Sequence, residues 1–231
     1  VTDKILFVTA NFRQGTNYWF ICAGISGQWY GITTSGVTVL TPVTATTYIS
    51  DQYTDLTTFT ASWNGNVAFI NDGINPPMYL LPTATEIRLF DYAYGDQTPN
   101  TYIWNYYSPT WSNLTAKFMR VYSSPNVGSI LIAGNLNYTQ SGVGYNLPNT
   151  VRWSQGFGIN SGPTTWAPTL TNVANELEVP VRGPLIDGFS INGNFYVCSY
   201  WDTVVFSPIA YTTTTAPVFG IKLLNQGRGL L

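Results

Sequence analysis

Two Asn-Gly pairs, each set between runs of β-branched and aromatic residues, constrain the fold of this chain more than any other feature. The stretch Ser62-Trp63-Asn64-Gly65-Asn66 is similar to Ser190-Ile191-Asn192-Gly193-Asn194. Asn and Gly both tolerate the positive φ that a type I′ turn needs, and Asn-Gly between apolar runs is a strong hairpin signal. Both stretches are therefore predicted to be β-hairpins, and their similarity indicates an internal repeat.

Short apolar runs of strand length recur along the whole chain, separated by Gly, Pro, Asn and Ser. They group into four meander-like units at approximately 4–50, 55–92, 116–168 and 183–231. The surplus residues fall at 92–114 and 135–148, which we interpret as loops. No convincing helix is expected, because the strongest candidate, 171–178, is short and would end at Pro180.

This pattern predicts an all-β protein made of β-propeller-like repeated antiparallel meanders, with a β-sandwich as the alternative. We expect residues 1–231 to form a single all-β segment. The chain begins at Val1 rather than Met, so we expect a fragment of a longer chain or a processed product, and part of a larger propeller.

The composition narrows the functions that are open to the chain. Charged residues are only 9%, against roughly 25% in an ordinary soluble domain. The net charge is −2 and no segment is basic, which argues against a protein that binds nucleic-acid phosphates through Lys and Arg. Histidine is absent, which excludes imidazole as a general base, metal ligand or pH switch. We expect neighbouring subunits to cover part of so uncharged a surface, and no apolar run approaches the ~18 residues of a membrane span.

Two cysteines, Cys22 and Cys198, each lie inside an apolar strand pattern. A disulfide between distant strands is one reading. Buried free thiols are the interpretation that we favour, because unpaired cysteine behaves as a small apolar residue.

Acidic residues offer few catalytic candidates. Asp51 with Asp55, and Glu176 with Glu178, are the close pairs, and glycoside hydrolysis needs two carboxyl groups that face each other across a sugar. Solvated loop or strand faces explain both pairs better. We therefore assign no catalytic residue and expect that the protein is not an enzyme.

Two Asp-Gly pairs, Asp72-Gly73 and Asp187-Gly188, could belong to calcium loops. Neither has the regular Asp/Asn spacing of such a loop, and turn chemistry explains them. A Gly-rich phosphate loop followed by Lys is also absent. We predict no metal-binding residue, no cofactor-binding residue and no cofactor.

Aromatic residues are concentrated in one loop. They are Tyr92, Tyr94, Tyr102, Trp104, Tyr106, Tyr107 and Trp111. Flat rings of this kind can stack on sugars, but Tyr and Trp are equally favoured at contacts between proteins. We favour a protein interface and keep a carbohydrate platform, or packing onto the domain itself, as alternatives.

A family resemblance is carried by the second half of the chain. Its motifs are Asn149-Thr150-Val151-Arg152-Trp153-Ser154, Pro163 to Trp166, Gly183-Pro184-Leu185-Ile186-Asp187-Gly188, Val218-Phe219-Gly220 and Gly227-Arg228-Gly229. This order resembles the β-propeller part of short-tailed (podovirus-type) bacteriophage tail tube or nozzle proteins, which are related to packaged-DNA stabilisation proteins. Asn71-Asp72-Gly73 with Pro76-Pro77-Met78-Tyr79 is similar to an earlier blade. In many relatives an acidic residue follows the serine, whereas this chain has Gln155.

The resemblance implies a structural virion protein, made in the host cytoplasm and built into the phage tail. It implies a homo-oligomeric ring, with a hexamer expected, that retains packaged DNA and conducts it during ejection. The implied partners are adaptor or portal-proximal tail proteins, tail fibres, and duplex DNA that passes without sequence-specific binding. We assign Trp153 and Trp166 to packing, and expect Arg152 to bond a loop carbonyl or a neighbouring carboxylate.

Two other functions remain open at this point. A carbohydrate-binding protein, either a lectin-like propeller or a receptor-recognition module, would use loop residues such as Trp104 and Trp111. A glycoside hydrolase propeller would need two carboxylates that converge in a central cavity, and the scattered acids make it the weakest of the three.

Overall fold

The computed structural model describes residues 2–11, 18–43, 48, 53–90, 111–125, 128–209 and 218–226, with the backbone alone at 111–113, 225 and 226. Every helix or strand in this part of the chain is a β-strand, which confirms the predicted all-β class. The described residues accordingly contain no helix that could span a membrane.

Sixteen described strands form four consecutive antiparallel meanders of four strands each. The first meander comprises β1 (Ile5–Ala10), β2 (Phe20–Gly24), β3 (Trp29–Thr33) and β4 (Gly36–Val43). The second comprises β5 (Thr60–Asn64), β6 (Val67–Asn71), β7 (Met78–Leu80) and β8 (Glu86–Leu89). The third comprises β9 (Trp111–Ser124), β10 (Gly128–Gln140), β11 (Val143–Trp153) and β12 (Asn175–Glu178). The fourth comprises β13 (Leu185–Ile191), β14 (Asn194–Ser199), β15 (Asp202–Pro208) and β16 (Phe219–Gln226).

The first two meanders join edge to edge. Strand β4 pairs in parallel with β8, so the two meanders make one eight-stranded sheet in the order β1-β2-β3-β4-β8-β7-β6-β5. The third and fourth meanders remain separate four-stranded sheets. Backbone pairing of strands therefore joins the first two meanders, whereas side-chain contacts join the later ones.

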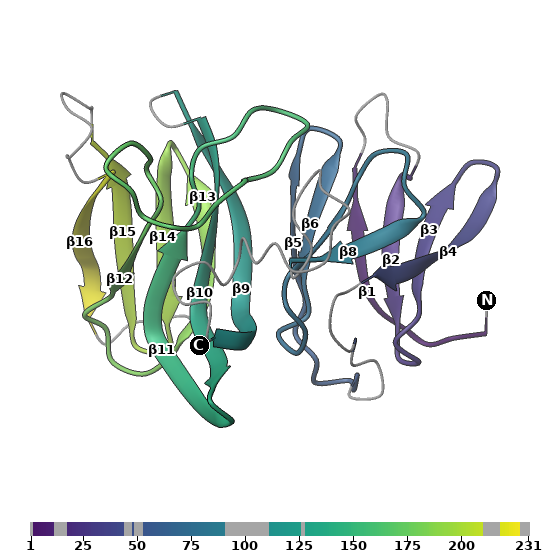
Figure 1. Cartoon of the computed structure of the whole chain (residues 1–231), viewed down its shortest axis with the longest axis horizontal. Coiled ribbons are helices and arrows are strands. Elements are labelled where there is room, and N and C mark those ends of the chain that lie inside the picture. Colours follow the sequence, from purple (N-terminus) through teal and green to yellow (C-terminus); the bar gives the residue numbers. More distant parts are fainter. Residues whose placement is uncertain are drawn as a thin grey trace.

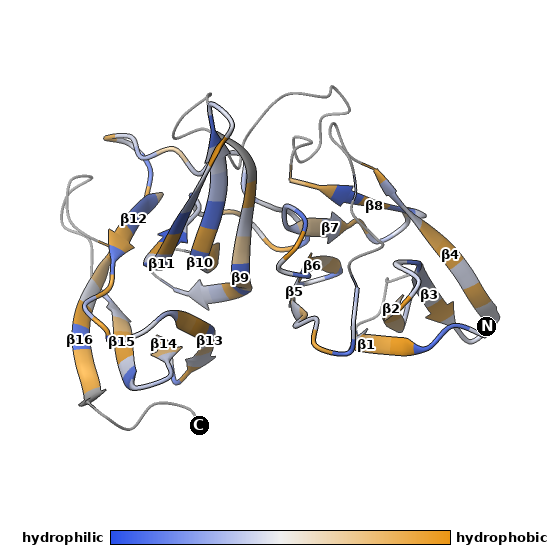
Figure 2. Cartoon of the chain, turned by 90° about the horizontal axis from the view of Figure 1, so that it is seen from below, coloured by the Kyte–Doolittle hydropathy of each residue, from blue (hydrophilic) through white to orange (hydrophobic). Residues whose placement is uncertain are grey.

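The four meanders lie side by side in chain order (Figure 1). Seen from below, they form an arc in which β1, β5, β9 and β13 lie toward the concave side, while β4, β8, β12 and β16 lie outside (Figure 2). We call β1, β5, β9 and β13 the inner strands. This is the arrangement of neighbouring blades in a propeller, in agreement with the predicted repeated antiparallel meanders.

Three apolar layers hold the arc together, one between each pair of neighbouring meanders. In β6, Val67 and Phe69 point to the third meander, while Ala68 and Ile70 point to the first, because successive side chains of a strand alternate between its faces. The central residues of the layer between the second and third meanders include Phe69, Tyr79, Phe90, Met119, Leu131 and Trp166. The layer between the third and fourth includes Phe118, Tyr122, Ile132, Trp153, Phe195 and Phe206.

The two Asn-Gly pairs form hairpins, but only one has the predicted geometry. Asn192 and Gly193 both have positive φ, 49° and 74°, as a type I′ turn requires. Asn64 instead ends β5, and the two-residue loop is Gly65-Asn66, with positive φ only at Gly65. The predicted type I′ turn is wrong here by one residue. Asn64 is held in the strand because its side chain bonds a loop of the third meander.

One local prediction was also wrong. The segment 135–148, predicted as a loop, is the end of β10 and the beginning of β11, paired from Leu136↔Leu147 to Gln140↔Val143. Its polar residues are typical of a loop, so this part of the sequence contained no strand signal. The strands are stabilised by backbone pairing and by the stacked rings of Tyr138 and Tyr145, whose centroids are 5.1 Å apart. The segment 171–178, for which no convincing helix was expected, contains strand β12, which pairs with β11 from Thr150↔Glu178 to Trp153↔Asn175.

Candidate functional site

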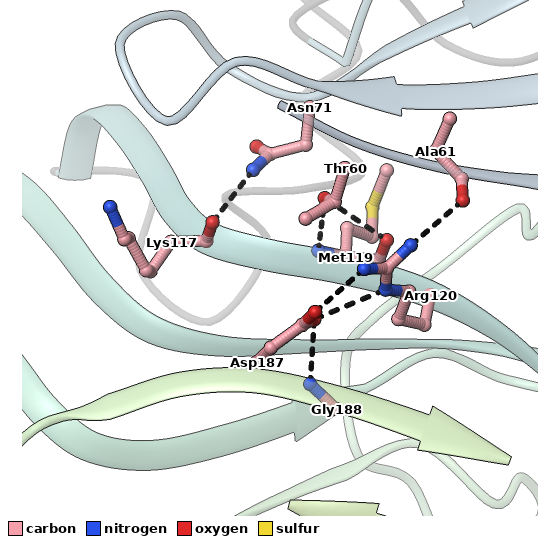
Figure 3. A network of polar contacts seen from close by, with 8 residues as sticks. All are labelled: Thr60, Ala61, Asn71, Lys117, Met119, Arg120, Asp187 and Gly188. Atoms are coloured by element: carbon pink, nitrogen blue, oxygen red, sulfur yellow. Dashed lines mark hydrogen bonds and ion pairs between the residues drawn. The ribbon is translucent and has the colours of Figure 1, made fainter. Parts of the chain in front are cut away.

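Arg120, in the middle of β9, links three sheets (Figure 3). Its Nε and Nη2 donate to the two carboxylate oxygens of Asp187 on β13, at 3.1 and 2.7 Å. Its Nη1 donates to the carbonyl of Ala61 on β5, at 3.0 Å. Asp187 also accepts from the backbone N–H of Gly188 at 2.7 Å. One guanidinium thus ties together the inner strands of the second, third and fourth meanders.

Side chains of the second meander bind the backbone of β9 beside Arg120. The hydroxyl of Thr60 accepts from the N–H of Met119 at 3.1 Å and donates to its carbonyl at 3.4 Å. The amide of Asn71 donates to the carbonyl of Ala116 at 3.0 Å and to that of Lys117 at 3.3 Å, and Figure 3 shows the second of these bonds. Strand β9 is the edge of its own sheet, so the backbone N–H and C=O groups on its unpaired side need other partners. These side chains supply them where no strand does.

The same kind of link continues to the first meander. Trp63 on β5 donates its indole N–H to the hydroxyl of Thr9 on β1, at 3.0 Å. Asn11, directly after β1, donates to the carbonyl of Gly65 at 3.1 Å. The side-chain links between inner strands therefore run through all four meanders. We call them the inner seam, defined by Thr9, Ala61, Trp63, Arg120 and Asp187.

The inner seam carries no net charge. Arg120 and Asp187 form one ion pair, with side chains 27% and 36% exposed, so both charges are partly solvated and mutually compensated. Close by, the ammonium of Lys117 donates to the hydroxyl of Thr58 at 2.6 Å. Both carboxylate oxygens of Asp187 are occupied by donors. The arrangement suits a rigid polar lining on the concave side of the arc, in which the charges of Arg120 and Asp187 cancel while Lys117 adds one cation.

A second polar cluster is buried between the first two meanders. Asp72 accepts from the hydroxyl of Tyr53 at 2.6 Å and from the side-chain amide of Asn75 at 2.7 Å, and its other oxygen accepts from backbone N–H groups of the same turn. The chain of bonds continues through Tyr48 to the indole of Trp29. Burial raises the pKa of Asp72, and burial also raises the pKa of Tyr53.

These contacts give Asp72 a structural role. Its side chain holds the turn of Asp72 to Asn75, where Gly73 has a positive φ of 72°. This agrees with the interpretation of Asp72-Gly73 as turn chemistry. Across the described ranges, no group of three or more acidic or cysteine side chains is placed to hold a metal ion.

The acidic pair Glu176 and Glu178 lies on extended strand β12, opposite Arg152 and Thr150. The two side chains therefore share one side of the strand. Glu176, however, accepts from Nε and Nη2 of the fully buried Arg152, at 3.2 and 2.9 Å. The carboxylate contact expected for Arg152 is therefore present. Glu176 is thereby committed to an ion pair.

The tryptophans of the family motifs are packing residues, as predicted. Trp153 lies in the layer between the third and fourth meanders and donates to the carbonyl of Val173 at 2.6 Å. Trp166 is fully buried in the preceding layer, with its ring edge-on to Phe90 at 6.3 Å. Ser154 is buried and its hydroxyl accepts from the N–H of Leu131 at 3.0 Å. The motif around Arg152 therefore fixes the strand and its following loop.

Several sequence-based candidates lie outside the described residues. These are Asp51 and the loop aromatics Tyr92, Tyr94, Tyr102, Trp104, Tyr106 and Tyr107, while Trp111 begins β9. Asp55, the partner of Asp51 in sequence, forms an exposed ion pair with Lys4 at 2.5 Å. The structure therefore leaves the interface and carbohydrate readings of the aromatic loop as predictions.

Cys22 and Cys198 are both buried free thiols, which confirms the favoured interpretation. Cys22 lies on β2 of the first meander and Cys198 on β14 of the fourth, at opposite ends of the arc (Figure 1). Burial raises the pKa of each thiol.

Arg120, the central residue of the inner seam, was not predicted from the sequence. Arg120 is a charged residue inside the apolar run Phe118-Met119-Arg120-Val121-Tyr122, and that interruption was the available signal. Its partner Asp187 was interpreted only as part of a turn, although it lies within β13. No protein-family model matches this chain, and no curated protein matches it.

Proposed function

We propose that this chain is a structural, non-enzymatic component of a phage tail, forming part of a ring-shaped nozzle or tube. In this proposal the ring retains packaged DNA and conducts it during ejection. The observation that carries the proposal is the inner seam, where the guanidinium of Arg120 on the concave side is neutralised by Asp187. A conduit for duplex DNA benefits from such a lining, because each free Lys or Arg would bind phosphate and retard passage.

Two further features support this function. The four meanders pack face to face in an arc, the arrangement expected of a propeller segment (Figure 2). The motif residues that resemble the tail-protein family, Arg152 to Ser154 and Trp166, have structural contacts rather than free functional groups. In the proposed tail the partners are further copies of the chain, adaptor or portal-proximal proteins, fibres, and DNA in transit.

The first test of this proposal is the mass of the purified chain in solution, followed by electron microscopy of any assembly. A closed ring with an axial channel wide enough for duplex DNA is the expected result. A monomer that binds glycans specifically would contradict it and favour the carbohydrate-binding alternative.

A sharper test addresses the compensated charge of Arg120. Asp187→Asn removes the charge that compensates Arg120, so the assembled variant should retain duplex DNA more strongly than the wild type at low salt. Each additional phosphate that the ring binds should steepen the salt dependence of DNA binding by a slope of about 0.9. Glu86→Gln is the matched control, because it removes the negative partner of Arg88 on the outer strand β8. Equal DNA retention by both variants would argue against a DNA path along the inner strands.

A further inference from the structure

The first meander has a face, directed away from the second meander, with exposed apolar side chains on its first and last strands. Ile21 and Ala23 of β2 point into the layer shared with the second meander, so Cys22 points the other way. Backbone pairing places Val8, Cys22, Tyr30 and Val39 in one row across the four strands of this face. Val8 and Val39, at the two ends of the row, are each 53% exposed. We call this the first outer face.

The fourth meander has a matching face at the other end of the arc. Phe195 and Val197 of β14 point into the layer shared with the third meander, so Tyr196 points outward. The row across this face is Phe189, Tyr196, Val205 and Lys222. The rings of Phe189 and Tyr196 stack at 5.5 Å, and Phe189 is 36% exposed. We call this the second outer face.

The internal interfaces indicate what covers these two faces. Meanders one to four are joined by three successive apolar layers, each formed by the far face of one meander and the near face of the next. The next contact in this series would join the second outer face to a first outer face. Within one chain these faces lie at opposite ends of the arc (Figure 2), and a second copy of the chain offers a face of each kind with which to continue the series.

The charges on the two faces are opposite. Among the seven Lys and Arg side chains that the structure describes, five form ion pairs and Lys117 bonds a hydroxyl, while Lys222 projects from the second outer face. The first outer face carries Asp3, whose carboxylate accepts from Tyr30 at 3.1 Å and covers Gly24. An acid on one face and a cation on the other favour contact between unlike faces over contact between like ones.

We propose that the second outer face of one copy packs on the first outer face of another, forming a layer of the same kind as the three internal layers. The contact is head-to-tail, so repetition gives a ring where the rotation closes and a filament where it does not. This inference rests on the proposed function in so far as that function requires copies of the chain to assemble, and it assigns the surfaces that do so.

Single-face variants test the proposal in the 231-residue chain. Val39→Asp damages only the first outer face, and Phe189→Asp only the second. Each variant alone should run at the monomer mass of 25.5 kDa by light scattering, whereas the wild type assembles. An equimolar mixture should give a dimer and nothing larger, because each variant contributes one intact face. Ile191→Asp, at a more exposed position on the second outer face, should repeat the result of Phe189→Asp. Leu170→Asp, at an exposed loop position, is the control and should assemble like the wild type.

The outcomes separate this inference from the proposed function. Rings that persist in both Val39→Asp and Phe189→Asp, with the variants folded by circular dichroism, would overturn the assigned faces and leave the conduit proposal standing. A head-to-tail filament without a channel would support the faces and contradict the conduit. Assembly lost in Val39→Asp but kept in Phe189→Asp would show a like-with-like contact and overturn the inference. A wild type that stays monomeric would overturn both, and would leave the faces to a different chain.

Discussion

Replacing Glu176 by Gln should destabilise the protein far more than a surface substitution does. Arg152 is fully buried, and its Nε and Nη2 donate to the same carboxylate oxygen of Glu176, at 3.2 and 2.9 Å. Removing one partner of a buried pair costs about 3–5 kcal/mol, because the remaining charge is left in a poorly solvated place. Glutamine keeps an acceptor, and the side chain of Glu176 is 32% exposed, so water reaches the site. We therefore expect a loss of about 2 kcal/mol, near the value of a hydrogen bond to a charged group.

Urea denaturation followed by tryptophan fluorescence measures this loss, since Trp153 is the neighbour of Arg152 on β11. For a chain of this length, about 2 kcal/mol corresponds to a fall in Tm of roughly 4–8 °C. Glu178→Gln is the matched control, on the same side of β12 but exposed, and should change stability by less than about 0.5 kcal/mol. The double variant Arg152→Met with Glu176→Met should recover most of the loss, because no buried charge remains. If Glu176→Gln were as stable as Glu178→Gln, Glu176 would not be what compensates the buried guanidinium.

Three other predictions follow from packing and burial. Gly188→Ala should lower the free energy of unfolding by about 1–3 kcal/mol, because a Cβ there would lie 2.7 Å from the ring of Phe195. Gly144→Ala is the control and should be neutral, because its Cβ would meet no atom within 4 Å. Equal denaturation midpoints for the two variants would contradict this prediction. Burial raises the pKa of Tyr48 to about 12. The contribution of the neutral Tyr48 side chain to folding stability should therefore be complete below a pH of about 10, and should be lost as the pH rises through about 12. Tyrosinate absorbance of the folded protein measures this, and titration of all tyrosines together near a pH of about 10 would refute the prediction. The buried thiol of Cys198, whose pKa burial raises, should react with a thiol reagent far more slowly in the native protein than in urea, and equal rates would show that it is accessible.

The sequence allowed the strands to be predicted but not the faces they share. The run Val67-Ala68-Phe69-Ile70 reads as a strand, yet all four residues are fully buried, because meanders cover both faces of β6. Periodicity indicates how many faces are buried, and not which neighbour buries each one. The repetition of the meanders could therefore be predicted from local sequence, but the order in which they pack could not.

Long-range side-chain bonds account for most of what was missed. Asn64 donates to the carbonyls of Gly158 and Ser161, which are more than 90 residues further along the chain, and this holds it in β5 instead of the turn. Arg120 and Asp187 are 67 residues apart. Local turn propensity could not anticipate either contact, since each depends on how two meanders are placed side by side.

The roles of the motif residues were easier to predict, because burial of a large ring or pairing of two neighbouring strands requires little knowledge of how the meanders pack. Trp153 and Trp166 are large apolar residues next to a strand and a Pro-containing loop, for which burial is the expected outcome. Arg152 lies in a strand that pairs with one bearing Glu176, so an ion pair needs only the correct register. The resemblance to tail proteins drew attention to these residues, but physical chemistry alone explains their contacts.

The few charges of this chain serve mainly as internal links. The sequence has nine basic residues, and five of the seven that the structure describes are ion-paired. The pairs are Lys4 with Asp55, Arg88 with Glu86, Arg120 with Asp187, Arg152 with Glu176, and Arg182 with Asp202. Charges compensated in this way contribute little to the repulsion that keeps protein molecules apart. A chain that uses its charges internally and leaves aliphatic and aromatic side chains on the ends of an arc is suited to an assembly, where those ends meet, more than to a solitary domain.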